Sequence, residues 1–226
     1  MNLVIDIGNT AAKLGVFDST ELKSVQSVKS NTIEAGVTDL KSQFKIDKCV
    51  VSSVTELRSG GISALKQIKT LDFNHKTPIP IKNKYETPET LGLDRLANAV
   101  ALFKHYPNSP ALAIDFGTCI KYDLVNVKGE YLGGSISPGM QMRYKALNEF
   151  TAKLPLAAPT DNVQLTGTNT ETSIKSGVQR GICAEINGII EEYRAQYSEL
   201  QVVFTGGDHK YFAKAFKNSI FARPNL

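Results

Sequence analysis

A short phrase occurs twice in this sequence, and its residue types are suited to holding phosphate. The two copies are Asn2-Leu-Val-Ile-Asp6-Ile-Gly8-Asn9-Thr10 and Ala111-Leu-Ala-Ile-Asp115-Phe-Gly117-Thr118. A carboxylate at the end of an apolar run can hold a hydrated divalent cation. The glycine lets the backbone turn sharply beside a ligand, and the side chains and N–H groups that follow can donate to phosphate oxygens. A single Asp-x-Gly is common at ordinary tight turns, but two copies predict a site for the phosphates of one nucleotide.

The first copy continues directly into a run that predicts a second strand. In this run Ala12, Leu14 and Val16 alternate with Lys13, Gly15 and Phe17. The pattern is that of a β-hairpin with the phosphate turn at its tip. Lys13 lies just past this turn, where its ammonium could reach a β- or γ-phosphate and offset charge during transfer.

A second group of candidate residues closes a proline-rich loop at residues 75–90. Tyr85 lies in this loop, and Gly92-Leu93-Asp94-Arg95 follows it at the start of a predicted helix. Asp94 could take a proton from a substrate hydroxyl as that hydroxyl attacks phosphorus. Arg95 could hold a substrate carboxylate at two points, and Tyr85 could cover the bound molecule. The alternative for Asp94 is equally strong locally, because an acid in a first helical turn also complements the helix dipole.

Three further loops carry glycine or hydroxyl side chains. The turn Thr205-Gly206-Gly207 could lie flat against a nucleoside, but many strand-to-helix turns use Gly-Gly. The loop from Gly133 to Gly139 reads as a strand-to-helix turn that could shape a pocket wall. The segment Leu165–Thr172 is dense in hydroxyls before a helix. Helix capping explains most of that segment, and substrate contact by one threonine is the alternative.

Composition bounds the class of protein. The chain has 226 residues with 42% hydrophobic content, enough for an ordinary globular core. The formal charge of +4 and the lack of a basic run with interleaved aromatics argue against a nucleic-acid partner. Three scattered cysteines argue against disulfides and a zinc site. No apolar stretch approaches the ~20 residues that span a bilayer, and the N-terminus does not resemble a signal peptide. We therefore expect a soluble cytoplasmic protein with no membrane partner.

The order of predicted elements repeats itself and predicts a duplicated α/β architecture with a nucleotide in the cleft. The segment from His105 to Pro110 carries two prolines and is the best boundary, which gives an N-terminal domain over 1–108 and a C-terminal domain over 109–226. The predicted strands are 2–7, 12–17, 22–28, 49–54, 111–115, 119–125, 131–136 and the run from Val202. The predicted helices are 32–44, the stripe Ile62, Leu65 and Ile68, the stripe Leu96, Val100 and Phe103, and residues 139–149, 174–198 and 208–218.

Together these motifs resemble the type III pantothenate kinase family, which belongs to the superfamily of acetate and sugar kinases, heat-shock chaperones and actin. The resemblance runs across nearly the whole length. Its broad elements are the two Asp-x-Gly phrases, which the entire superfamily shares. Its narrower elements are Tyr85 with Gly92-Leu-Asp94-Arg95, and the loop Gly133-Gly134-Ser-Ile-Ser-Pro138-Gly139.

The resemblance implies duplicated actin-like (ribonuclease H-like) domains with a nucleotide cleft between them. It also implies ATP-dependent phosphorylation of pantothenate to 4′-phosphopantothenate, the first step of coenzyme A biosynthesis. The implied cofactors are ATP with Mg²⁺ and a monovalent cation, K⁺ or NH₄⁺, and a homodimer is implied because the family presents a substrate-contacting threonine from the neighbouring subunit.

The resemblance also assigns residues. Asp94 is the implied catalytic base, Asp115 the monovalent-cation site, and Asp6 a Mg²⁺ ligand through water. The implied ATP-binding residues are Asp6, Ile7, Gly8, Asn9, Thr10, Ala11, Ala12, Lys13 and Thr118. The implied substrate-binding residues are Tyr85, Gly92, Leu93, Asp94, Arg95 and Thr170.

One stretch departs from the family pattern. After Asp115-Phe-Gly117-Thr118 the family usually continues Ala-x-Thr, whereas this chain has Cys119-Ile-Lys121. Lysine in place of threonine adds a cation near the second phosphate turn. We hypothesise that the requirement for a monovalent ion is therefore weaker than is usual in the family.

Two alternative functions stay open from the sequence. The first is another small-molecule kinase of the same superfamily, such as a sugar or acetate kinase. Such sugar kinases normally have longer chains, and the Tyr85 and Gly92–Arg95 set favours an alcohol that bears a carboxylate. The second is a nucleotide-binding accessory regulator without catalysis, for which 226 residues leave little room for a partner-binding domain. Replacement of Asp94 discriminates between a kinase and such a binding protein.

Overall fold

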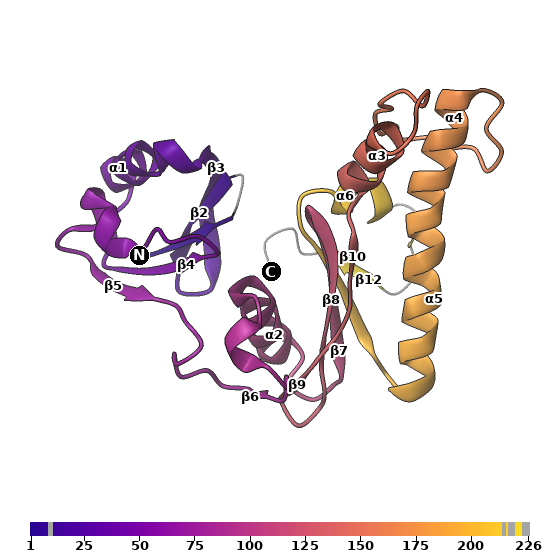
Figure 1. Ribbon diagram of the computed structural model, residues 1–226. Coiled ribbons are helices and arrows are strands. Elements are labelled where there is room, and N and C mark those ends of the chain that lie inside the picture. Colours follow the sequence, from indigo (N-terminus) through magenta and orange to yellow (C-terminus); the bar gives the residue numbers. More distant parts are fainter. Residues whose placement is uncertain (9–10, 214–215, 217–219, 223–226) are drawn as a thin grey trace. The chain divides into compact units, whose positions relative to one another are not determined.

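The computed structural model describes residues 1–8, 11–213, 216 and 220–222 (Figure 1). The chain divides into two units. Unit 1 comprises Met1–Pro78 and Thr87–Ala97, and unit 2 comprises Ile79–Glu86 and Asn98–Leu226. By this division residues 79–86 and 98–108 group with unit 2. The predicted domain ranges 1–108 and 109–226 stay a prediction, as does the nucleotide cleft.

The sheet of unit 1 is built on a three-strand meander. Its strand order is β3-β2-β1-β4-β5, with antiparallel pairing of β3, β2 and β1 and parallel pairing of β1, β4 and β5. Strict alternation fixes which face is buried, because Leu3, Ile5 and Ile7 of β1 are at most 1% exposed while their neighbours are not. The strands are β1 Asn2–Ile7, β2 Ala11–Asp18, β3 Glu21–Lys29, β4 Lys48–Ser53 and β5 Lys69–Asp72.

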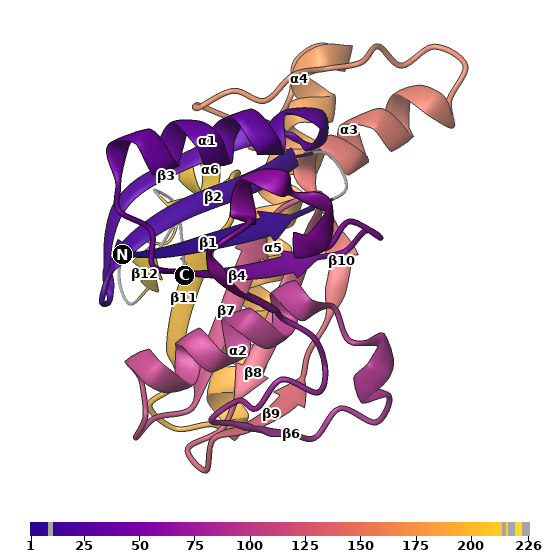
Figure 2. The same cartoon turned by 90° about the vertical axis from the view of Figure 1, so that its left-hand side faces the viewer.

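One helix covers the buried face of this sheet. Helix α1 (Ile33–Gln43) contributes Ile33, Val37 and Leu40 to the core, the i, i+4, i+7 spacing of a single helical face. Figure 2 shows α1 lying along β2 and β3. The Cys49 thiol is part of the same core, and burial raises its pKa to about 12, so it stays protonated. The opposite face of the sheet is therefore the one on which polar side chains can be presented.

Unit 2 repeats the topology of unit 1. Its strand order is β12-β11-β7-β8-β9-β6, in which β7, β8 and β9 are antiparallel and β7, β11 and β12 are parallel. The succession β9-β8-β7-β11-β12 thus corresponds to β3-β2-β1-β4-β5. Two short strands are added, β6 beside β9 and β10 beside β8. The strands are β6 Lys82–Asn83, β7 Ala111–Phe116, β8 Cys119–Val125, β9 Glu130–Gly133, β10 Ile136–Pro138, β11 Gln201–Thr205 and β12 Ile220–Ala222.

The core of unit 2 lies between this sheet and its helices. Helices α3 (Met140–Glu149), α5 (Gly181–Gln196) and α6 (His209–Ala213) contribute to it, with alternate residues of β7, β8 and β11. Phe116 is its aromatic centre, with its ring 5.0 Å from that of Phe212 and 4.9 Å from that of Phe204. Helix α2 (Leu93–His105) starts within the residues of unit 1 and ends within those of unit 2.

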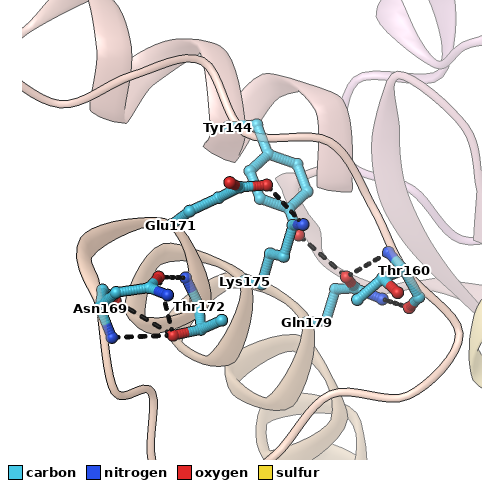
Figure 3. A network of polar contacts seen from close by, with 7 residues as sticks. All are labelled: Tyr144, Thr160, Asn169, Glu171, Thr172, Lys175 and Gln179. Carbon is cyan, nitrogen blue, oxygen red and sulfur yellow. Dashed lines mark hydrogen bonds and ion pairs between the residues drawn. The ribbon is translucent and has the colours of Figure 1, made fainter.

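A continuous helical run is interrupted by one wide turn. Helix α4 (Thr170–Lys175) passes through a π-helical turn at Ser176–Arg180 into α5. Gln179 is buried in this turn. Its side-chain oxygen accepts from the Tyr144 hydroxyl (2.9 Å) and from the Thr160 N–H (3.1 Å), and its amide nitrogen donates to the Thr160 carbonyl (2.9 Å) (Figure 3). Gln179 thereby links the segment around Thr160 to α3 and to the π turn between α4 and α5.

The structure differs from several predicted elements, and it adds the unpredicted strands β5, β6 and β12. The stripe Ile62, Leu65 and Ile68 is not a helix but contains a 3₁₀ turn at Ser63–Leu65, and β5 follows it. The single strand predicted over 131–136 is two strands, because Gly134 has a φ of +155° and turns the chain. The helix predicted over 174–198 starts earlier, at Thr170. Of the helix predicted over 208–218, α6 covers His209–Ala213, and residues 214–215 and 217–218 lie outside the described residues.

The predicted α/β fold with a duplicated strand plan is confirmed by this topology. No helix in the described part of the chain is long and apolar enough to cross a membrane.

We predict that Gln179→Leu destabilises the protein by about 2 kcal/mol or more, because it removes three hydrogen bonds and leaves buried polar groups without partners. Urea unfolding followed by circular dichroism measures this loss. Glu171→Ala is the matched control from the same helical run, since it removes an exposed ion pair with Lys175, and such pairs contribute little. Equal losses in the two variants would contradict the importance assigned to Gln179.

Candidate active site

The first phosphate phrase forms the tight turn between β1 and β2. The Gly8 N–H donates to the Ala11 carbonyl at 3.0 Å, which closes the turn. The predicted residues Asn9 and Thr10 lie outside the described residues. Ile7 and Ala12 face the core and are 1% and 0% exposed, so only their backbone groups could contact a nucleotide. The turn therefore presents backbone rather than side chains at these two positions.

Strand register places three polar side chains in one row across the first sheet. Asp6 lies opposite Lys13 of β2 and opposite Ser52 of β4. Alternation puts all three on the face away from the core. Lys13 is exposed and Asp6 is half-buried. Ser52 is 9% exposed, and its Oγ has no hydrogen-bond partner among the described residues. A buried hydroxyl without a partner beside a carboxylate fits a site that a ligand or water completes.

The start of α2 holds the predicted base. The Gly92 carbonyl accepts from the Leu96 N–H (3.1 Å), so the helix begins directly after Gly92. The Asp94 Oδ1 accepts from the Arg95 N–H at 2.9 Å, which orients the carboxylate. A Cβ on Gly92 would lie 2.5 Å from that same oxygen, so only glycine leaves room for the carboxylate in this orientation. Arg95 is buried, with 4% of its surface exposed.

The loop before α2 is anchored within unit 1. The His75 Nε2 lies 2.7 Å from the Leu91 carbonyl oxygen, and the Thr90 N–H donates to the Thr87 carbonyl at 3.0 Å. Leu91 itself is 2% exposed. These contacts hold the backbone that leads to Gly92 in place. A stabilised loop therefore positions the predicted site residues Gly92, Leu93, Asp94 and Arg95.

The second phosphate phrase forms the turn between β7 and β8. The Gly117 N–H donates to the Cys119 carbonyl at 3.1 Å, and the Gly139 N–H donates to the Thr118 carbonyl at 3.1 Å. The loop that starts at Gly133 is therefore tied to this turn where α3 begins. Thr118 is exposed, and its side chain is available to a ligand.

Asp115, near the end of β7, forms an ion pair with Lys121, the lysine that replaces the threonine usual in the family. The Lys121 Nζ lies 2.8 Å from the Asp115 Oδ2, and the side chains are 18% and 16% exposed. Asp115 lies opposite Lys121 in β8 and opposite Thr205 in β11. The row Lys121, Asp115 and Thr205 is the counterpart in unit 2 of the row Lys13, Asp6 and Ser52.

Tyr85 packs within unit 2. Its N–H donates to the Asn83 Oδ1 at 2.9 Å, and its ring centroid lies 6.2 Å from that of Tyr131. A Cβ on Gly133 would lie 3.3 Å from the Tyr85 ring, so the ring rests on the glycine backbone at the start of the Gly133–Gly139 loop. The structure thus brings Tyr85 into contact with the Gly133–Gly139 loop, two family-specific parts of the motif that are distant in sequence.

The far end of the Gly133–Gly139 loop is held by a charged cluster. Glu185 of α5 accepts from the Tyr122 hydroxyl (3.0 Å), the Ser137 hydroxyl (2.6 Å) and the Arg143 guanidinium (2.5 Å). Burial acts to raise the pKa of Glu185, but hydrogen bonds from Ser137 and Arg143 outweigh it and hold the pKa below its ordinary value. The ionised carboxylate therefore joins β8, β10 and α3 to α5.

Thr170 is presented at the exposed first position of α4. Asn169 caps this helix, because its Oδ1 accepts from the Thr172 N–H at 2.9 Å while the Thr172 hydroxyl accepts from the Asn169 N–H at 3.0 Å (Figure 3). This reciprocal cap is the predicted role of the hydroxyl-rich segment. It also leaves the Thr170 side chain exposed at a fixed helix terminus.

The predicted residues thus fall into two groups, one in each unit. Asp6, the β1–β2 turn, Lys13 and the α2 start belong to unit 1, and Asp115, Thr118, Tyr85 and Thr170 belong to unit 2. Across the described residues, no cluster of three or more His, Cys, Asp or Glu side chains is placed to hold a metal ion. Sequence reasoning missed Ser52, since its only signal is its position at the end of an apolar run.

The duplicated α/β fold, with an aspartate near the end of each central strand, is an actin-like fold. A solved structure from Campylobacter jejuni, described provisionally as a conserved Baf family transcriptional activator, has the same fold. Its TM-score is 0.62 at 20% identity, and the match covers 98% of this chain and 91% of that chain.

The chain belongs to the type III pantothenate kinase family. The family model described as type III pantothenate kinase matches residues 2–192. Relatives of that name include one from Christiangramia forsetii, 44% identical over 100% of this chain and 94% of the relative. Another, from Phocaeicola vulgatus, is 43% identical over 98% of this chain and 92% of the relative. The resemblance to this family is therefore confirmed.

We predict that Gly92→Ala lowers kcat by about tenfold to a hundredfold, because the added Cβ displaces the Asp94 carboxylate and small misplacements of a reacting group cost that much. ADP release in the presence of pantothenate measures the effect. Gly60→Ala is the matched control in unit 1, since a Cβ at Gly60 meets no atom within 4 Å. Full activity of Gly92→Ala would show that the Asp94 carboxylate does not need its observed orientation.

Proposed function

We infer that this chain transfers the γ-phosphoryl group of ATP to pantothenate and forms 4′-phosphopantothenate, the first step of coenzyme A biosynthesis. The family membership supports this activity. The single observation of the structure that supports it most directly is the Asp94 carboxylate, which is oriented by the Arg95 N–H and given room by Gly92.

The proton transfer is assigned to Asp94. The attacking group of pantothenate is a primary alcohol, which is a weak nucleophile until a base takes its proton. Asp94 accepts that proton as the oxygen bonds to phosphorus, and ADP leaves. Arg95 is charged and buried, and we assign it to the pantothenate carboxylate. Tyr85, Gly92 and Leu93 complete the proposed substrate contacts.

The nucleotide contacts are assigned to both phosphate turns. In unit 1 they are Asp6 to Lys13, with backbone groups at Ile7, Gly8, Ala11 and Ala12 and with Asn9 and Thr10 carried over from the family motif. In unit 2 the contact is Thr118. Lys13 is exposed on the same face as Asp6, which supports its role as a counter-charge to phosphate.

A divalent metal accompanies ATP in this family, and Mg²⁺ supplies charge neutralisation on the phosphates. Mg²⁺ keeps several waters and uses few protein ligands, so one carboxylate suffices. Asp6 would hold the ion through water. The buried Ser52 hydroxyl, without a partner among the described residues, lies next to Asp6 in the row and fits this hydrated site.

The resemblance assigns a monovalent cation, K⁺ or NH₄⁺, to Asp115, but we do not include that ion in the proposed function. In this chain such an ion competes with the Lys121 ammonium for the same carboxylate oxygen. The cytoplasmic location remains a prediction, which rests on the lack of a signal-peptide pattern and on the scattered cysteines.

We also propose a homodimer, in which Thr170 contacts the substrate of the neighbouring subunit. Two observations support it. Thr170 is exposed at a capped helix terminus, and the segment between α3 and α4 exposes apolar side chains, with Phe150 83% and Leu165 72% exposed. We take these side chains to belong to a surface that the neighbouring subunit covers, since large exposed apolar patches mark interaction sites.

We predict ADP release with pantothenate and none with acetate, glycerol or hexoses, and a loss of about a hundredfold or more in turnover for Asp94→Asn. Nucleotide affinity, measured by calorimetry, should survive in this variant because Asp94 is assigned to the acceptor and not to ATP. Glu89→Gln is the matched control, an exposed carboxyl in the same loop that has no assigned role. Unchanged turnover in Asp94→Asn would remove Asp94 from the mechanism.

We predict that Leu165→Asp weakens the dimer, because it places a charge in the apolar segment that the neighbouring subunit would cover. We expect Thr170→Ala to leave the dimer intact. Light scattering coupled to size exclusion measures the mass. Thr170→Ala should raise the KM for pantothenate about threefold to tenfold, the value of one hydrogen bond. Val127→Asp, an exposed apolar site in the β8–β9 turn, is the control. A wild-type protein that is monomeric at assay concentration would rule out the proposal.

A further inference from the structure

The two units carry the same arrangement of three side chains at equivalent points of the repeated sheet. In each unit an aspartate ends the central strand, a lysine lies opposite it on the antiparallel neighbour, and a hydroxyl lies opposite it on the parallel neighbour. The rows are Lys13, Asp6 and Ser52 in unit 1, and Lys121, Asp115 and Thr205 in unit 2. Lys121 is therefore the topological counterpart of Lys13 and not an isolated surface charge.

The ion pair in unit 2 is close and largely covered. The Lys121 Nζ lies 2.8 Å from the Asp115 Oδ2, the length of a charge-assisted hydrogen bond. The two side chains are only 18% and 16% exposed. Water and salt screen such a pair less than they screen an exposed one, so the ammonium is a substantial counter-charge for this carboxylate.

The other oxygen of Asp115 is covered by backbone. Gly206 has a φ of +87°, and a Cβ on it would overlap the Asp115 Oδ1 and the Phe116 backbone. The Asp208 N–H donates to the Phe116 carbonyl at 3.1 Å, which holds the Gly206–Gly207 turn against the end of β7. Asp115 thus has one oxygen against this turn and the other on the Lys121 ammonium.

We propose that Lys121 is a tethered counter-cation for Asp115, so that this enzyme neither binds nor needs a diffusible monovalent cation there. An ion at the Asp115 Oδ2 would have to displace an ammonium that is covalently held beside it, at a high effective concentration. If both were present, their like charges would repel each other. The residues at Asp115 therefore do not fit a potassium or ammonium ion. The activity readout of this inference rests on the proposed kinase function, whereas its binding readout does not.

The first test compares ions with the wild-type protein. The rate of ADP release with pantothenate is measured as K⁺ replaces choline at constant ionic strength. We expect a change of less than about twofold, because the counter-charge is already present. Thallium(I), a potassium mimic, is titrated separately without nucleotide and followed by ²⁰⁵Tl NMR, and we expect no saturable binding. Saturable Tl⁺ binding, or a rate that rises about tenfold or more with K⁺, overturns the inference.

The second test uses variants of Lys121. Lys121→Thr restores the residue typical of the family, and we expect saturable Tl⁺ binding and a stimulation by K⁺ of about tenfold or more. Lys121→Met keeps the aliphatic length but not the charge, and it should lose activity. Lys23→Thr is the matched control, since it removes a lysine from an ion pair in β3 and should behave like the wild type.

The outcomes separate the inference from the proposed function. Lys121→Met with full activity, or folded Lys121→Thr without any response to K⁺ or Tl⁺, overturns the inference. If Lys121→Thr fails to fold, the wild-type titrations and Lys121→Met still decide. If the wild type phosphorylates no pantothenate with any ion, the proposed function fails, while Tl⁺ binding alone still decides whether Asp115 is a cation site.

Discussion

The register of each central strand with its two neighbours is the constraint on which both rows of lysine, aspartate and hydroxyl side chains depend. Asp6 and Asp115 share a strand with core residues at alternate positions, so a slip of one residue would turn the carboxylate into the core. The same buried alternation that stabilises each sheet therefore aligns a lysine on one side of the aspartate and a hydroxyl on the other. Chemistry and core packing are specified by one pattern.

Much of this arrangement could be predicted from local sequence. The meander at the N-terminus, α1, α2 and α3 are found within a few residues of their predicted bounds, because period-two and period-3.6 patterns are bounded there by turn residues. The placement of Asp94 in the first turn of α2 is confirmed for the same reason. Its role as a base stays a prediction, since a helix start suits an acid with or without catalysis.

What could not be predicted depends on contacts between distant segments. Ser52 gains meaning only from the pairing of β1 with β4, and the Lys121–Asp115 ion pair only from the register of β8. The stripe from Ile62 to Ile68 has helical spacing, yet these residues pack as 3₁₀ turns and the approach to β5. In the π turn, Gln179 donates a hydrogen bond to Thr160, which lies 19 residues earlier in the chain, and no local sequence pattern predicts that contact.

Because space at Gly92 is limited, a change that stabilises the start of α2 conflicts with the orientation of the Asp94 carboxylate. A helix N-terminus is commonly strengthened by replacing the residue before it with serine, threonine, aspartate or asparagine, which gains some stability over glycine. Here every such replacement adds a Cβ that collides with the Asp94 carboxylate. If Asp94 is the base, engineering for thermostability by helix capping would thus lower turnover when it is applied at this position, a local trade-off between rigidity and turnover.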